Sequence, residues 1–453
     1  MADLRAGAAA ADITPPLSIP FLGYVPRQGR FEGVHDRLRA RALALDDGTR
    51  QLVLVTADAI GFADGILGPE RSFRAAFHEA VAAAAGLAPD QVMLAASHAH
   101  STPETLDITA LYEVPGAVDW ADGLCRTLAA TVAEALESLQ PARLKTAEGR
   151  AEGIATNRRQ LLADGSFWQP SHGSPPAPVL RPGQVDETVP VVLAELEDGT
   201  CVVLANFTCH PVSVQVNPLV SADYPGVACA LVEAAIPEVS HCLFTQGADG
   251  DINPRGGGSR QDFGDVARYG RILGGEIIEQ AEQLRAPEVK AMEPVIGAAA
   301  APLELPVREL PEAAPLAQEC EAARGALEAA GTEAERFVAA NRVRAAEERQ
   351  RTLAKGPGPI RTEVQALRLG DVALVGLPGE NFCETGLGIK RRSPAPHTLV
   401  AGLSGDAIGY LPTRESFDQG GYETTVGSTH YEPGAAERLV DAAAEQLDRL
   451  FDT

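Results

Sequence analysis

Two histidines, His98 and His100, are separated by one residue and follow an apolar run, Gln91 to Ser97, that is typical of a β-strand. Because side chains alternate along an extended backbone, we expect both imidazoles on one face of the chain. Such a pair can bind one metal ion together, or can divide into a metal ligand and an acid/base group beside the metal. A hydrogen-bonded structural pair is the alternative, and this motif alone leaves the choice open.

His210 and Glu380 lie in comparable positions. His210 follows the apolar run VVLANF and precedes a proline, which disfavours continuation of a strand. Glu380 ends the sequence LPGE after the apolar run VALVGL, where proline and glycine predict a tight turn. Each residue also has a structural interpretation, as a hydrogen-bonded buried imidazole for His210 and as a carboxylate near a helix N-terminus for Glu380.

These residues belong to five motifs that each follow an expected strand. In an α/β sheet, the residues beyond the carboxyl ends of the strands line the ligand crevice. We therefore expect the motifs to meet in space, although they are far apart in the sequence. They are SHAHS (97–101), TCHP (208–211), QGADGDINP (246–254), PGE (378–380) and the segment 402–410.

The elements that must position the motifs alternate between short apolar runs and longer amphipathic runs. This alternation predicts an α/β fold with mixed sheets covered by helices. We expect strands near residues 51–59, 91–97, 191–196, 201–207, 242–245 and 364–376. We expect helices near residues 64–87, 120–139, 266–284 and 435–451, and another after Pro225.

The chain has no internal repeat and no clear linker, so we expect a single catalytic domain over residues 1–453. Residues 311–355 are rich in Ala, Glu and Arg and predict an inserted helical hairpin with solvated faces. Residues 168–182 are dense in Pro, Gly and Ser and predict an exposed loop or lid.

Composition argues against several classes of protein. Hydrophobic residues make up 45% and charged residues 22%, which is typical of a globular protein rather than a disordered or fibrous one. The formal charge of −24 disfavours nucleic acid and anionic membranes as partners. No stretch resembles a secretory signal or a membrane span, and the seven cysteines lack CxxC spacing. We therefore expect a cytoplasmic protein with a small-molecule substrate and no stable membrane association, with homo-oligomer formation left open.

Taken in order, the motifs resemble the neutral, non-lysosomal ceramidase family. Because several motifs agree in the expected order over nearly the whole chain, the resemblance is more specific than any one of them. It implies a neutral-ceramidase-like catalytic domain as the fold. The matching segments are AGAAAADITPP (6–16), GVHD (33–36), HAHS (98–101), NR (157–158), TCHP (208–211), GDINP (250–254), PGE (378–380) and GLSGDAIGYLPTRESFDQGGYE (402–423).

The resemblance implies a Zn²⁺ site. Its ligands would be His98, His210, Glu380 and Tyr410, and His100 would be the family's active-site histidine beside the metal. Imidazole, carboxylate and phenol groups suit zinc and leave a position for water, whose pKa the metal lowers towards neutrality. We expect the resulting hydroxide to be the nucleophile, with His100 transferring protons or stabilising charge.

Arg158 and Tyr422 match polar groups of the family that contact the substrate or the transition state, and they could donate hydrogen bonds to an oxyanion. Asn253 departs from the family, which carries an active-site serine at this position. An amide cannot act as an alkoxide-type nucleophile, but its NH₂ group can still donate a hydrogen bond. A metal-activated water therefore remains available to this chain, whereas a serine-dependent step does not.

Members of this family continue into a C-terminal immunoglobulin-like domain, which we do not expect here because the sequence ends at Thr453. We expect a zinc-dependent hydrolase that uses a metal-activated water to cleave an amide (N-acyl) bond in a soluble substrate. One alternative is hydrolysis of an ester or glycosidic bond at the same metal site. The other is a non-catalytic binding protein braced by the metal.

Overall fold

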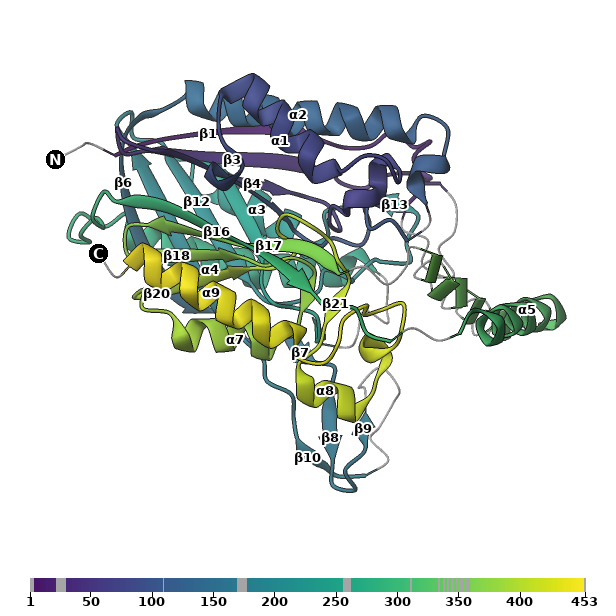
Figure 1. Ribbon diagram of the computed structural model, residues 1–453. Helices are drawn as coiled ribbons and strands as arrows, with labels where there is room; N and C mark the ends of the chain where they lie inside the picture. Colours follow the sequence, from purple (N-terminus) through teal and green to yellow (C-terminus); the bar gives the residue numbers. More distant parts are fainter. Residues whose placement is uncertain are drawn as a thin grey trace.

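A large mixed sheet forms the centre of the computed structural model (Figure 1). Its eight strands follow the order β14 (Val239–Gln246), β12 (Cys201–Phe207), β11 (Thr188–Leu196), β6 (Gln140–Arg150), β1 (Arg5–Asp12), β3 (Arg39–Asp46), β4 (Gln51–Ala57) and β5 (Val92–Ala96). The neighbouring pairs β12/β14 and β4/β5 are parallel, and the other neighbouring pairs are antiparallel. The structure describes residues 4–21, 30–108, 110–168, 177–255, 262–309, 312–332 and 359–451, with isolated positions between 335 and 354.

A second, four-stranded sheet packs face to face on the first. Its strands are β16 (Ile296–Leu305), β17 (Ile360–Leu369), β18 (Val372–Gly376) and β20 (His397–Ala401), in that order. One hydrophobic cluster joins the two sheets, with Met93 and Leu243 contributed by the large sheet and Leu374 and Leu399 by the small one. Both faces of the large sheet are covered, which explains why strands such as β12 are buried along their whole length and are mostly apolar.

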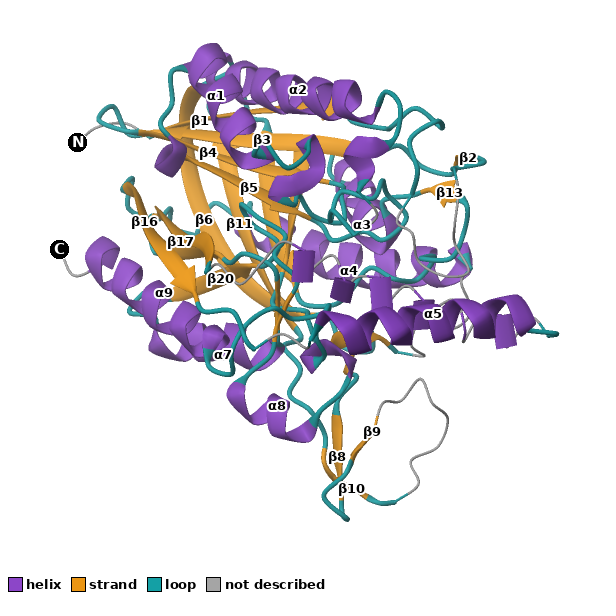
Figure 2. Ribbon diagram, turned by 45° about the vertical axis from the view of Figure 1, so that its right-hand side comes forward, coloured by secondary structure: helices purple, strands orange, loops and turns teal. Residues whose placement is uncertain are grey.

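Helices cover the outer faces of both sheets (Figures 1 and 2). The large sheet is covered by α1 (Phe73–Ala85), α2 (Ala117–Glu137), α3 (Asp223–Ala235) and α4 (Phe263–Leu284). The small sheet is covered by α7 (Cys383–Arg392) and α9 (Ala435–Phe451). The result is a four-layered arrangement of helices, sheet, sheet and helices, so the predicted fold class is confirmed.

Shorter elements complete the described chain. Paired strands are β2 (Gly33–Val34) with β13 (Leu219–Val220), β7 (Ala155–Asn157) with β15 (Ile252–Pro254), and β19 (Glu380–Asn381) with β21 (Tyr410–Leu411). A small three-stranded sheet contains β8 (Gln160–Leu162), β9 (Phe167–Trp168) and β10 (Val179–Arg181). Helical turns include Asp64–Leu67, Pro89–Gln91, Leu111–Glu113, α8 (Arg414–Gln419) and Tyr422–Thr424.

Most expected elements are present, with corrected ends. The helix expected at 64–87 is divided into a short turn over Asp64–Leu67 and helix α1, because Gly68 and Pro69 interrupt it. In the two main sheets, the strands β1, β3, β6 and β16 were missed, and the alanine-rich segments among them lack the β-branched residues that predict strands. The expected loop at 168–182 includes β10, which is exposed, while residues 169–176 lie outside the described residues.

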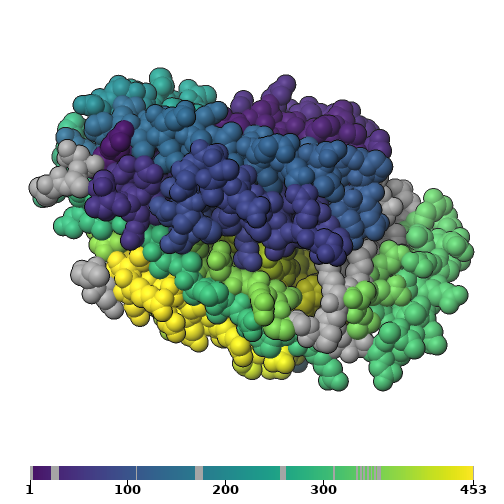
Figure 3. All heavy atoms as spheres, turned by 45° about the horizontal axis from the view of Figure 1, so that its top comes forward, coloured from purple at the N-terminus to yellow at the C-terminus, as the bar shows by residue number. Residues whose placement is uncertain are grey.

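The expected hairpin insertion at 311–355 includes α5 (Ala313–Ala329), and much of the remainder lies outside the described residues. Helix α5 extends from one end of the molecule, away from both sheets (Figures 1 and 3). In the space-filling view, the N-terminal elements in purple and the C-terminal elements in yellow lie on opposite sides. Among the described residues, no helix has the length and apolar character required to cross a membrane.

Candidate metal centre and active site

The expected site residues lie at the carboxyl ends of strands from both sheets. His98 follows β5, and His210 follows β12. The loop 246–254 follows β14, the parallel neighbour of β12, and Glu380 follows β18 of the smaller sheet. A main-chain hydrogen bond from His210 N to Ile252 O ties two of these segments together (3.0 Å). The structure therefore brings together motifs that are far apart in the sequence.

Three imidazoles and one carboxylate form a compact cluster. Nε2 of His210 lies 3.2 Å, and Nε2 of His98 lies 3.5 Å, from the same oxygen, Oε2 of Glu380. Nε2 of His100 lies 3.4 Å from Nε2 of His98. The three histidines offer one ligand atom each, and these atoms lie within 4.8 Å of one another. Nitrogen and oxygen donors this close together can share one divalent ion.

Main-chain carbonyls orient the two fully buried rings. Nδ1 of His98 donates a hydrogen bond to Ile60 O (2.6 Å), and Nδ1 of His210 donates to Asp249 O (2.7 Å). Because a carbonyl oxygen can only accept, each Nδ1 carries a proton, and Nε2 is the nitrogen available to a metal. Metal-binding imidazoles are commonly held in this way through their other nitrogen.

His98 and His100 meet for a different reason from the one expected. His98 has a φ of 64°, in the left-handed region, so the chain is not extended through the motif and side-chain alternation does not apply. The turn buries the ring of His98 completely, whereas His100 is partly exposed, and the ring centroids lie 4.8 Å apart. A left-handed residue other than glycine costs about 1–3 kcal/mol, which the surrounding contacts must offset.

Glu380 and Tyr410 are register partners in the parallel pair β19/β21. The turn before Glu380 requires glycine, because Gly379 has a φ of 67° and a Cβ there would lie 2.5 Å from Gly409 O. The Tyr410 hydroxyl is hydrogen-bonded to Glu380, and burial together with the charge of that carboxylate raises the pKa of Tyr410. Tyr410 therefore adds to the cluster a phenol oxygen that could bind a metal ion.

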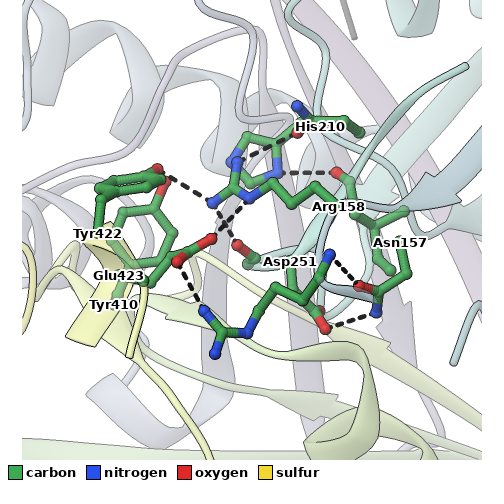
Figure 4. Close-up of polar contacts among 12 residues, drawn as sticks. Asn157, Arg158, His210, Asp251, Tyr410, Tyr422 and Glu423 are labelled. Carbon is green, nitrogen blue, oxygen red and sulfur yellow. Dashed lines mark hydrogen bonds and ion pairs between the residues drawn. The ribbon is translucent and has the colours of Figure 1, made fainter. Parts of the chain in front are cut away.

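Arg158 organises a second group of side chains beside the cluster (Figure 4). Its Nε donates to Oε1 of Glu423 (3.0 Å), and its Nη1 donates to Oδ1 of Asn253 (3.1 Å). Its Nη2 donates to the hydroxyl of Tyr422 (3.0 Å), which in turn donates to the hydroxyl of Tyr410 (2.5 Å). A continuous chain of hydrogen bonds thus runs from the Arg158 guanidinium to the cluster.

The bond from Arg158 fixes the orientation of the Asn253 amide. Because the amide oxygen accepts from the guanidinium, the NH₂ group is turned away from Arg158 and is the part that can donate to a bound molecule. The backbone supports this geometry, since Asn253 lies in β15, which pairs with β7 immediately before Arg158, and Arg158 N donates to Asp251 O (2.8 Å).

The electrostatics of the cluster favour a positive charge. Burial lowers the pKa of His98, but the charges of Asp249 and Glu380 outweigh burial and raise that pKa to about 9. Burial raises the pKa of Glu380, but His98 and His210 outweigh it and hold that pKa well below its usual range. A site that stabilises a proton on His98 among nitrogen and oxygen donors also fits a divalent metal ion.

Sequence reasoning assigned no role to two buried carboxylates of the site. Glu423 is fully buried and accepts from both Arg158 (3.0 Å) and Arg159 (2.9 Å), which lie about 260 positions earlier in the chain. Asp249 is fully buried next to His210. No spacing signal points to Glu423 as an ion-pair partner, and nothing in the sequence separates Asp249 from the other aspartates that follow strands.

The fold and the cluster together define a four-layered α/β protein with a candidate metal centre where two sheets meet. The family described as neutral/alkaline non-lysosomal ceramidase, N-terminal, matches residues 4–267, more than half of the 453 residues. The chain belongs to this family, and the resemblance inferred from the motifs is confirmed.

The chain is similar to individual members over different lengths. It is 24% identical to neutral ceramidase A of Dictyostelium discoideum over 264 residues, which cover 55% of this chain and 35% of that protein. It is 22% identical to the neutral ceramidase from Pseudomonas aeruginosa, whose crystal structure matches with a TM-score of 0.73 over 99% of this chain and 75% of that one. A ceramidase complexed with C2 gives a TM-score of 0.74, at 22% identity, over 99% and 76% of the two chains.

Proposed function

We propose that the chain is a zinc-dependent hydrolase that cleaves an amide (N-acyl) bond in a soluble, small-molecule substrate. The observation that carries this proposal is the buried cluster, in which Nε2 of His98 and Nε2 of His210 approach one oxygen of Glu380. Membership of the neutral/alkaline ceramidase family supports hydrolysis, and supports an amide as the bond that is broken.

The proposed zinc ligands are His98, His210, Glu380 and Tyr410, which offer two imidazole nitrogens, a carboxylate and a phenol oxygen. When bound by such a set, zinc polarises a carbonyl group and lowers the pKa of water. The hydrogen bonds from Nδ1 of both histidines to main-chain carbonyls support this assignment, because they hold each Nε2 towards the proposed ion.

His100 is the proposed acid/base group. Unlike His98 and His210, it is partly exposed, and its Nε2 lies beside the cluster, 3.4 Å from Nε2 of His98. From this position His100 can take a proton from an attacking water and deliver it to the nitrogen of the leaving amine. An amide needs this second transfer in particular, because an unprotonated amine anion is a poor leaving group.

Asn253 is the proposed donor to the negative charge that develops on the carbonyl oxygen of the substrate, and Tyr422 becomes a second donor when its hydroxyl hydrogen turns from Tyr410 to that oxygen. Arg158 orients both of them through Nη2 and Nη1. Donors held in place before the reaction need no reorganisation, and removal of one such donor costs about 2.7–4 kcal/mol in characterised enzymes. Tyr422 is 44% exposed, which suits contact with an entering substrate.

The proposal includes a soluble substrate and a cytoplasmic location. The formal charge of −24 supports a substrate taken from solution rather than from an anionic membrane. The seven cysteines are all free of disulfides, which supports a reducing compartment. Fractionation of the native cells tests the location.

Metal content tests the zinc site. Purified protein should contain about one zinc ion per chain by mass spectrometry, since one ligand set is proposed. The variants His98→Ala and His210→Ala should lose both zinc and hydrolysis. The matched control is His241→Ala, because His241 lies on β14 outside the cluster and should retain both. A metal-free wild-type protein that hydrolyses its substrate would refute the proposal.

A panel of substrates tests which class of bond the protein hydrolyses. N-acyl amines, carboxylic esters and glycosides should be offered to the zinc-loaded protein, and turnover of N-acyl amines is expected. If only esters or only glycosides are hydrolysed, the proposed amide cleavage would be rejected, whereas the proposed metal site would be retained. Tight zinc binding with no turnover of any class would favour the metal-braced binding protein instead.

A further inference from the structure

Asp249 is a buried carboxylate that the proposed reaction does not use. It lies in the loop after β14, its side chain is fully buried, and among the described residues neither of its carboxylate oxygens has a hydrogen-bond partner. An uncompensated carboxylate is strongly unfavourable in a protein interior, so buried ones normally have a partner or a nearby cation.

The carboxylate of Asp249 lies behind His210, on the side opposite the proposed metal. Its Oδ2 is 3.5 Å from Nδ1 of His210, and the main-chain oxygen of the same residue accepts the hydrogen bond from that Nδ1 (2.7 Å). One residue thus presents both a carbonyl and a carboxylate to the ring nitrogen that does not face Glu380. Groups in this position orient a metal-binding imidazole and raise its basicity.

The charges of the surrounding interior also point to a role for Asp249. With neutral imidazoles, the four carboxylates and two guanidiniums buried around the cluster sum to a charge of −2, which a divalent cation would neutralise. Loss of one carboxylate would leave the metal-bound site with an excess positive charge. The groups counted are Asp249, Asp251, Glu380, Glu423, Arg158 and Arg159.

We propose that Asp249 is a positioning residue of the metal centre, whose carboxylate holds the His210 ring and strengthens the binding of the divalent cation. This inference rests on the metal site of the proposed function. Asp249 then lies behind a ligand and is not itself a ligand, because its Oδ2 lies beside Nδ1 of His210, whereas Nε2 of His210 faces Glu380.

The test compares zinc dissociation constants by chelator competition in the wild type and in Asp249→Asn, which keeps the side-chain shape and removes the charge. The variant should bind zinc about 10- to 100-fold more weakly, the usual effect of removing such a partner. Asp249→Ser, a smaller neutral variant, should show a loss in the same range. The matched control is Asp58→Asn, since Asp58 is also buried but contacts Arg39 and Arg41 rather than the cluster, and its zinc affinity should be unchanged.

Two further readouts separate positioning from a general loss of stability. In Asp249→Asn, the metal-free protein should remain folded, and the rise in its melting temperature on adding zinc should be smaller than in the wild type. The visible absorption bands of the cobalt-substituted protein should also change in this variant but not in Asp58→Asn. Equal zinc affinity in wild type and Asp249→Asn would overturn the inference while leaving the proposed function intact. Absence of zinc binding by the wild type would instead overturn the proposed function.

Discussion

Replacement of Glu423 by glutamine tests whether one buried carboxylate supports the arrangement around Arg158. Glu423 is 0% exposed and pairs with Arg158 and Arg159, whose side chains are only 11% and 5% exposed. Glutamine keeps one acceptor but turns an NH₂ group towards the other guanidinium, so a donor faces a donor. Removal of one partner from a buried ion pair typically costs about 3–5 kcal/mol, and the retained acceptor places the expected loss near the lower end.

The assay combines urea denaturation at fixed zinc concentration with steady-state kinetics. Glu423→Gln should lose about 3 kcal/mol of unfolding free energy, since two buried guanidiniums lose their shared counter-charge. Its kcat should fall by about 100-fold, because Arg158 would no longer hold Asn253 and Tyr422 in place. The matched control is Glu415→Gln, whose partner Arg181 is 57% exposed and which should change stability by about 1 kcal/mol at most. Equal losses in the two variants would show that Glu423 does not support the arrangement around Arg158.

Three further perturbations test separate parts of the site. Tyr422→Phe should lower kcat by about 10²-fold with zinc content unchanged, because the ring stays and only the hydroxyl between Arg158 and Tyr410 is lost. Asn253→Ala should lower kcat by a similar factor of about 10², while Asn253→Gln should restore part of it if the NH₂ group is the donor. In metal-free protein, protonated His98 should stabilise the fold fully below about pH 6.5 and lose this effect as pH rises through about 9, which denaturation midpoints across that window would show.

The strands that carry the ligands could be predicted from sequence because their signal is local. The run before His210 is apolar at nearly every position, and the turn before Glu380 requires the glycine that LPGE supplies. The strands β1 and β3 were missed because alanine carries little strand propensity, so their conformation is set by pairing with neighbours in the sheet.

The details of the site could be predicted less well, because they depend on contacts between distant segments. Side-chain alternation along a strand correctly predicted that His98 and His100 lie together. The cause is different, because tertiary contacts hold His98 in a left-handed backbone conformation. The pairing of Glu423 with two arginines links positions about 260 residues apart, and no local pattern encodes it. The resemblance to the family supplied Tyr410, whose residue type alone predicts only a half-buried tyrosine.

Anomalous diffraction at the zinc edge from crystals of the zinc-loaded protein would locate the metal directly. We predict a single strong peak at which Nε2 of His98, Nε2 of His210 and a carboxylate oxygen of Glu380 meet, with zinc–nitrogen distances of about 2.0–2.1 Å. A peak at another place in the molecule, or none in crystals of protein that is catalytically active, would contradict it.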